Sequence, residues 1–242
     1  MKWALICGSS GDIGQQIAKD LANNGWSLYL HYYKNQAKVT SLIADLSELY
    51  PKQDFLALQA DLTYPETMVE FSKQIFGSLD ALIFAQGTTS YGLFSQKEPH
   101  EFDQMLAMQL QSPLRLIALL EDKLAKSNAG RIIFIGSVYG GAGSALEVGY
   151  STIKGAQSAF CKAYSKEAAT LQITVNTIAP GAVATQMNQM FSGTEKAEVT
   201  QEIPVGRFAD PKEISYFVKM LVDEAASYMT GQTLYVTGGW LR

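Results

Sequence analysis

The chain has 242 residues, 47% of them hydrophobic, a net charge of −4 and only two cysteines. The length suits one α/β domain, and the acidic balance argues against nucleic acid as a partner. With no long apolar run, no leader before the first expected strand and no metal-ligand or disulfide spacing, we expect a cytoplasmic protein without membrane span, disulfide or metal.

Apolar runs typical of strands alternate along the chain with amphipathic stretches typical of helices. The expected strands are 3–7, 27–31, 55–59, 81–85, 132–136, 174–178 and 233–236. Helical patterns lie between them, for example at 15–24, 39–49 and 65–76. Strands that are apolar on both faces and alternate with helices predict a parallel sheet covered on both sides. The sequence therefore predicts one doubly wound α/β domain, residues 1–242, with seven parallel strands.

A glycine-rich turn joins the first expected strand to the first expected helix. It runs from Gly8 to Gly14 and contains a third glycine, Gly11. Such a turn lets the backbone approach a pyrophosphate closely and directs helix N-terminal amides at it. Alone the motif is a weak signal, so its weight depends on residues far downstream.

Tyr150 and Lys154 are four residues apart, and Ser137 follows the expected strand 132–136. The spacing places phenol and ammonium on one helix face, one turn apart. A nearby cation favours phenolate, so we expect the pKa of Tyr150 to fall below its usual value near ~10. The Ser137 hydroxyl can hydrogen-bond a carbonyl oxygen beside the phenol. Together the three groups predict proton delivery to a ketone that receives a hydride.

The least regular region is 186–207, which follows Pro180 and Gly181. Its position makes it a candidate substrate lid. A plain surface excursion is an equally good interpretation of the same residues, so both stay open.

The turn, the serine and the Tyr150–Lys154 pair, in this order, resemble the short-chain dehydrogenase/reductase family over essentially the whole chain. The nearest branch is the 3-oxoacyl-acyl-carrier-protein reductase type. The resemblance implies a Rossmann-type fold, a nicotinamide cofactor and a homo-oligomer, commonly a tetramer. It also implies that Tyr150 is the general acid, that Lys154 lowers its pKa and holds the nicotinamide ribose, and that Ser137 orients the substrate carbonyl.

The same resemblance assigns cofactor contacts to several short segments. Those in the turn and after the second, third, fourth and sixth strands are Gly8, Ser10, Ile13, Gly14, Tyr33, Lys34, Asp61, Leu62, Ala85, Gln86, Gly87, Pro180, Gly181, Val183 and Thr185, joined by Tyr150 and Lys154.

Two departures from the family pattern concern polar residues. Asp12 stands where the turn usually has a glycine, and we expect it to cap the first helix. Gln109 stands where a helical asparagine often completes the catalytic set. It carries the same amide on a longer arm, so we count it among the catalytic candidates and expect catalysis to survive.

The end of the second strand bears on the choice of cofactor. An acidic residue there would bind the ribose hydroxyls of NAD and repel a 2′-phosphate. Here Tyr33 and Lys34 follow the strand, with no carboxylate. The charge favours NADPH, with NADH as the alternative. The alternative interpretation is that Lys34 is a solvated loop lysine.

Glu147, three residues before Tyr150, bears on the substrate. A carboxylate at the site mouth disfavours anions and suits an amine, although a helix-start carboxylate is an equally good interpretation. Segments 87–94 and 146–151 are similar to a subgroup that reduces a 5-aminopentanone group on elongation factor P. Candidate partners are therefore that factor and acyl carrier protein, beside small ketones. A non-catalytic nucleotide-binding scaffold is the alternative from another class.

Overall fold

The structure is a computed structural model, and it describes residues 1–127, 129–187 and 193–240. Seven strands form one sheet, in the order β3-β2-β1-β4-β5-β6-β7, and every neighbouring pair is parallel. Their bounds are β1 Lys2–Cys7, β2 Trp26–Tyr32, β3 Phe55–Gln59, β4 Ala81–Phe84, β5 Arg131–Ile135, β6 Thr174–Pro180 and β7 Thr233–Val236. The predicted sheet is confirmed, with strand ends that differ by one or two residues.

Alternate side chains of the central strands enter two separate cores. In β1, Ala4 and Ile6 belong to one buried cluster, whereas Leu5 and Cys7 belong to the other. This follows from the two-residue period of a strand. Because both faces are buried, the strands are apolar throughout, which is the pattern that predicted a parallel sheet.

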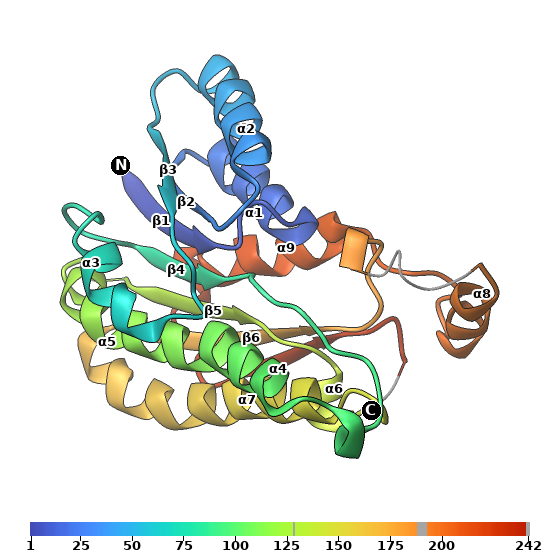
Figure 1. The fold of residues 1–242 in the computed structure, drawn as a ribbon. Helices are drawn as coiled ribbons and strands as arrows, with labels where there is room; N and C mark the ends of the chain where they lie inside the picture. The colour runs from blue at the N-terminus through green and yellow to red at the C-terminus, as the bar shows by residue number, and fades with distance from the viewer. Residues whose placement is uncertain (128, 188–192, 241–242) are drawn as a thin grey trace.

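Helices cover both faces of the sheet (Figure 1). On one face lie α1 (Asp12–Asn23), α2 (Gln36–Leu49) and α9 (Pro211–Leu221), which supply buried Ile17, Leu42 and Val218. On the other lie α3 (Met68–Ser72), α5 (Ser112–Ala125) and α7 (Val148–Ala168), which supply Phe71, Leu120 and Cys161.

Shorter elements complete the described chain. They are η1 (Pro65–Thr67), η2 (Phe94–Gln96), α4 (Pro99–Leu106), the π-helix η3 (Ala107–Gln111), α6 (Tyr139–Ala142), η4 (Ala169–Leu171), α8 (Gly193–Glu202) and η6 (Glu224–Ala226). The single helix expected at 65–76 is instead η1 followed by α3, and the Ser72 hydroxyl bonds back to Val69 O at the end of α3. Among the described helices, none combines the length and apolarity needed to cross a bilayer.

The strand order reverses beside β1, because β2 follows it on one side and β4 lies on the other. In a parallel sheet such a switch point opens a crevice at the carboxyl ends of the strands, where ligands bind. The glycine-rich turn after β1 and the segments after β4, β5 and β6 all lie at this edge. The fold therefore brings the candidate site residues to one side of the sheet.

Part of the candidate lid, residues 188–192, lies outside the described residues. The described remainder contains α8, which lies at one side of the domain (Figure 1), and Val199 of this helix packs against a small third core. After α8, the main chain is hydrogen-bonded to the C-terminal segment, since Val205 N donates to Gly238 O at 3.1 Å. Buried Ile203 and Trp240 both belong to the small third core. Whether the segment moves over a substrate stays a prediction.

Candidate active site

Ser137, Tyr150 and Lys154 meet at the carboxyl end of β5. Ser137 follows the strand, and the other two lie in the first two turns of α7. The Nζ of Lys154 is 5.4 Å from the centre of the Tyr150 ring, which confirms that spacing of four brings them together. Tyr150 is also hydrogen-bonded to Ser137. The face of α7 presents the phenol and the ammonium to the same small region, and the segment after β5 adds the Ser137 hydroxyl.

The expected fall in the pKa of Tyr150 is wrong for this structure. Burial of the phenol raises its pKa, the hydrogen bond with Ser137 opposes the rise, and the negative charge of Glu147 adds to it. Desolvation outweighs the neighbours because a buried phenolate loses its hydration. At neutral pH Tyr150 therefore keeps its proton, as a proton donor must.

Lys154 is the second perturbed group of the site. Only 3% of it is exposed, and its Nζ donates to Ile135 O at 2.9 Å. Burial lowers the pKa of Lys154 to about 7, since a charge is costly to hold away from water. Its protonation thus changes in the neutral range, where enzymes place acid–base groups.

Gln109 lies in the π-helix and is fully buried. Its Nε2 donates to Thr88 O at 2.8 Å, while its Oε1 has no hydrogen-bond partner among the described residues. A Cβ added to Gly87 would lie 3.1 Å from that Oε1 and 3.8 Å from Lys154 Nζ. The amide oxygen therefore faces the same space as the ammonium, and an unpaired buried acceptor needs a donor there.

Gln157 is a neighbour that the sequence prediction missed. It is buried, three residues after Lys154 on the same face of α7, and its Nε2 donates to Gln109 O at 2.7 Å. The i,i+3 spacing from Lys154 is the signal that could have found it. Its bond holds the main chain of the π-helix, so the side chain of Gln109 is the part left facing Lys154.

The turn at Gly8 and Gly14 leaves no room for side chains. Gly8 has φ +83°, and a Cβ there would lie 2.6 Å from Gln86 N. A Cβ on Gly14 would lie 2.2 Å from Gly8 O, so α1 packs directly on the turn. Ser10 accepts a bond from Gln15 through its main-chain oxygen, and Ile13 packs partly against the core. Glycine is therefore required at both positions by the close packing of the turn against α1 and against the segment after β4.

Asp12 does not cap α1, which corrects the expectation. The N-cap residue is Gly11, and no side chain bonds to the amides there. Asp12 instead accepts a hydrogen bond at 2.6 Å from the main-chain N–H of Gln186, at the start of the candidate lid. Lys38 Nζ donates to the Gln186 side chain at 3.0 Å. The free amides of α1 are thus still available to an anion.

Tyr33, Lys34 and Asp61 gather beyond the ends of β2 and β3. The Lys34 Nζ lies 4.9 Å from the centre of the Tyr33 ring, and Tyr33 is hydrogen-bonded to Asp61. Asp61 also accepts bonds from Thr63 N and Oγ1, at 2.9 and 2.7 Å. Partial burial raises the pKa of Asp61, but these bonds and the charge of Lys34 lower it overall.

The remaining predicted contacts lie after β3, β4 and β6. Leu62 is buried, and its main-chain oxygen accepts from Ser112 Oγ at 2.7 Å. Ala85 N donates to Cys7 O, which joins the ends of β4 and β1. The loop that begins at Pro180 and Gly181 is bonded at its start, because Val138 N donates to Pro180 O and Gly181 N donates to Val236 O. Further along this loop Val183 is buried, and its main-chain oxygen accepts from Thr185 N.

Glu147 precedes α7 but does not cap it with its side chain. Its Oε1 accepts from Thr89 Oγ1 at 2.6 Å, a partner that sequence alone did not suggest. Its charge raises the pKa of both Tyr150 and Tyr139, which places the carboxylate within electrostatic reach of the phenol. The second oxygen lies 3.5 Å from Ser144 Oγ. The carboxylate therefore lies within electrostatic reach of Tyr150, and its contact with a substrate stays a prediction.

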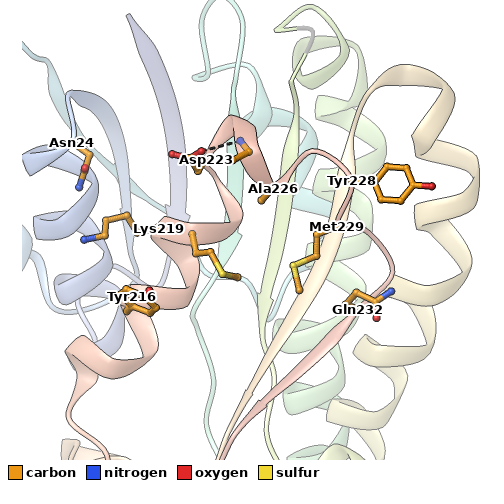
Figure 2. Close-up of a pocket in the computed structure, with 10 residues that line it drawn as sticks. Asn24, Tyr216, Lys219, Asp223, Ala226, Tyr228, Met229 and Gln232 are labelled. Carbon is orange, nitrogen blue, oxygen red and sulfur yellow. Dashed lines mark hydrogen bonds between the residues drawn. The ribbon is translucent and has the colours of Figure 1, made fainter.

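A hollow of about 820 Å³ lies at the opposite edge of the sheet, beside the amino end of β7 (Figure 2). Its lining includes Tyr216, Lys219, Asp223, Tyr228 and Met229. None of the predicted catalytic or cofactor residues belongs to that lining. Within the described ranges, no group of three or more metal-binding side chains occurs.

The parallel sheet, the glycine turn at its switch point and the acid–base group beside it define a dinucleotide-dependent oxidoreductase of Rossmann type. Residues 8–241 match a family model described as enoyl-(acyl carrier protein) reductase. The chain belongs to the short-chain dehydrogenase/reductase family and is similar to its 3-oxoacyl-acyl-carrier-protein reductases. The scaffold alternative is not favoured by this membership.

Relatives match along nearly the whole chain. An uncharacterized oxidoreductase of Bacillus subtilis, YmfI, is 38% identical over 99% of this chain and 98% of its own length. The 3-oxoacyl-[acyl-carrier-protein] reductase FabG of Vibrio cholerae is 32% identical over 98% and 96%. A solved structure of a Serratia marcescens short-chain dehydrogenase/reductase has a TM-score of 0.91 at 27% identity, covering 98% of this chain and 97% of that one.

Proposed function

We propose that this chain is an NADPH-dependent reductase that converts a ketone to a secondary alcohol. The observation that carries the proposal is the convergence of Tyr150, Ser137 and Lys154 at the carboxyl end of β5. A proton donor, a hydroxyl and a buried cation around one point suit an oxygen that gains negative charge. The uncapped amides of α1 and the close-packed Gly8–Gly14 turn fit a bound dinucleotide.

The chain's own groups would handle the proton. The cofactor, when bound, supplies a hydride to the carbonyl carbon. Tyr150, which keeps its proton at neutral pH, would donate it to the carbonyl oxygen as charge develops there. Ser137 would hydrogen-bond the same oxygen. Lys154 would hold the ribose, and its ammonium would favour the phenolate that the transfer leaves behind.

The choice of NADPH rests on the charges beyond β2. Lys34 supplies the cation, and Asp61, after the neighbouring strand, is engaged by Thr63 and Tyr33. A 2′-phosphate would meet Lys34, and the bonds that Asp61 already accepts leave less of it for ribose hydroxyls. NADH remains the alternative cofactor.

Initial rates test this function. We expect an acetoacetyl thioester to cause oxidation of NADPH, with kcat/KM for NADPH about tenfold above that for NADH, as one extra ion pair supports. A preference for NADH would contradict the NADPH assignment. If either cofactor bound but no ketone, including modified elongation factor P, caused turnover, the reductase assignment would fail.

Two carrier-bound substrates are compatible with the site. The relatives named FabG are 3-oxoacyl-[acyl-carrier-protein] reductases, which supports a 3-oxoacyl thioester. Glu147 instead suits an aminoketone such as the 5-aminopentanone group on elongation factor P, because a carboxylate beside the phenol attracts an ammonium. We keep the thioester as the leading proposal and the aminoketone as the alternative.

Glu147→Gln separates these substrates. The amide still accepts a bond from Thr89 but carries no charge, so KM for an aminoketone should rise about tenfold. KM for a neutral ketone of similar size should change less than about twofold. Paired steady-state measurements on the two ketones check this result, and equal changes would remove the charge argument.

We also infer that the chain self-associates, with a tetramer as the form expected for this family. The hollow at the far edge supports this inference, because it carries exposed Tyr216 and Tyr228 (Figure 2). Lys219 and Asp223 on the same surface have opposite charges. In a dimer with two-fold symmetry, Lys219 of one copy would lie opposite Asp223 of the second copy.

A further inference from the structure

His31 is a buried histidine in β2 that the catalytic proposal does not use. Only 3% of it is exposed, and the neighbouring strands are β1 and β3. Its Nδ1 lies 3.1 Å from the main-chain N of Gly8, and its Nε2 lies 3.1 Å from Ala60 O. Both ring nitrogens are therefore paired with main-chain groups, one after β1 and one after β3.

These partners fix which nitrogen carries the proton. The Gly8 N–H can only donate, so Nδ1 must be the unprotonated acceptor. The Ala60 carbonyl can only accept, so Nε2 must carry the hydrogen. A neutral ring satisfies both partners, whereas a charged ring would direct an N–H at the Gly8 N–H.

The surroundings also favour the neutral ring. Burial lowers the pKa of His31 to about 4, against the opposing effects of its bond to Ala60 and the charge of Asp61. The charge of Asp61 acts on the ring, which also packs against Phe71 in a T-shaped arrangement, with centroids 5.6 Å apart. One acidic neighbour does not offset the loss of hydration.

The main chain of His31 holds the next residue of the turn. Its carbonyl oxygen accepts two bonds from Ser9, at 2.9 Å from the N and 2.9 Å from the Oγ. Side chain and main chain of one residue thus fix two successive residues of the turn. Gly8 itself has a left-handed φ of +83° and offers no side chain that could hold it.

We propose that His31 is a positioning residue for the dinucleotide site, whose neutral imidazole holds the Gly8 amide and so fixes the shape of the pyrophosphate-binding turn. The proposal rests on the cofactor site proposed above. It follows that the Gly8 N–H faces His31 and not the ligand, and that the turn depends on a side chain 23 residues further along the chain.

Two substitutions test the role. His31→Leu leaves the Gly8 N–H and the Ala60 carbonyl unpaired, so Kd for NADP⁺ and KM for NADPH should rise about tenfold. The kcat at saturating NADPH should stay within about twofold, because the groups around Tyr150 are untouched. His31→Gln supplies an oxygen for Gly8 and an amide N–H for Ala60, and should restore Kd to within about threefold.

Asn176→Leu is the matched control. Asn176 is a buried residue of β6 whose side chain also bonds two main-chain groups, Met229 O at 2.7 Å and Gln232 N at 3.0 Å. Its loss should lower Tm about as much as His31→Leu and leave Kd for NADP⁺ unchanged. An equal rise of Kd in this control, or unchanged Kd in His31→Leu, would overturn the role of His31.

A pH titration covers the case in which His31→Leu fails to fold. The affinity for NADP⁺, measured by calorimetry, should fall more steeply in the wild type than in His31→Gln as pH decreases from 6.5 to about 3.5, because the pKa of His31 is about 4 and only the wild type loses the Nδ1 acceptor. Parallel curves would refute the proposal. A wild type that binds no nicotinamide cofactor at any pH would instead refute the cofactor site itself.

Discussion

Replacing Tyr150 by phenylalanine should lower kcat about 10³-fold, with little change in KM for NADPH. General acid catalysis by a positioned group contributes about 10²–10⁴ in rate, and the phenol is the proposed proton donor of this site. Phenylalanine keeps the ring beside Lys154 but removes the hydroxyl that bonds Ser137. Stopped-flow measurement of NADPH oxidation with an acetoacetyl thioester gives both constants.

Tyr139→Phe is the control for this result. Tyr139 is a second, partly buried tyrosine close to Glu147, and its ring lies edge-on to Trp240 at 5.8 Å between centroids. Because no proton transfer is assigned to it, kcat should stay within about threefold of wild type. Near-normal turnover in Tyr150→Phe, or a comparable loss in Tyr139→Phe, would show that the phenol of Tyr150 is not the acid.

Replacing Lys154 by methionine should abolish most of the activity and yet stabilise the protein at pH 6. The buried ammonium has a pKa lowered to about 7, and among the described residues its one hydrogen bond is to Ile135 O. Below pH 7 the native state must hold a costly charge that a methionine of similar length lacks. By linkage the free energy of unfolding should be higher in the variant by a few kcal/mol, after a loss of about 1 kcal/mol for the unpaired carbonyl.

The sign of the pH dependence makes this prediction specific. Between pH 7 and the ordinary lysine value near ~10.4, the unfolded chain binds a proton that the native state does not. The free energy of unfolding of the wild type therefore rises with pH across this window. The difference in stability between Lys154→Met and the wild type decreases accordingly. Urea unfolding at pH 6 and pH 9 measures the difference.

Lys162→Met is the matched control, since Lys162 is exposed on the same helix. It should change stability by less than about 0.5 kcal/mol at both pH values. If Lys154→Met were less stable than the wild type at pH 6, the hydrogen bond to Ile135 O and the surroundings would offset the cost of burying the ammonium, which would contradict the prediction. If it retained activity, Lys154 would have no part in the chemistry.

The sequence by itself determined the features that depend on local spacing. Seven strands and the layered helices follow from runs that are apolar on both faces, and the sheet order agrees with them. The meeting of Tyr150 and Lys154 follows from the 3.6-residue helical turn. The glycine turn is equally local, because its backbone conformation excludes side chains at Gly8 and Gly14.

Only the tertiary structure decided the partners and charges that depend on segments far apart in the chain. Asp12 bonds Gln186, 174 residues away, and Glu147 bonds Thr89, 58 residues away. The pKa of Tyr150 shifts in the direction opposite to the one that helix spacing suggests, because burial is a property of the packed domain. Periodicity reports which face a residue occupies, whereas hydrogen bonds and desolvation depend on what the fold places opposite that face.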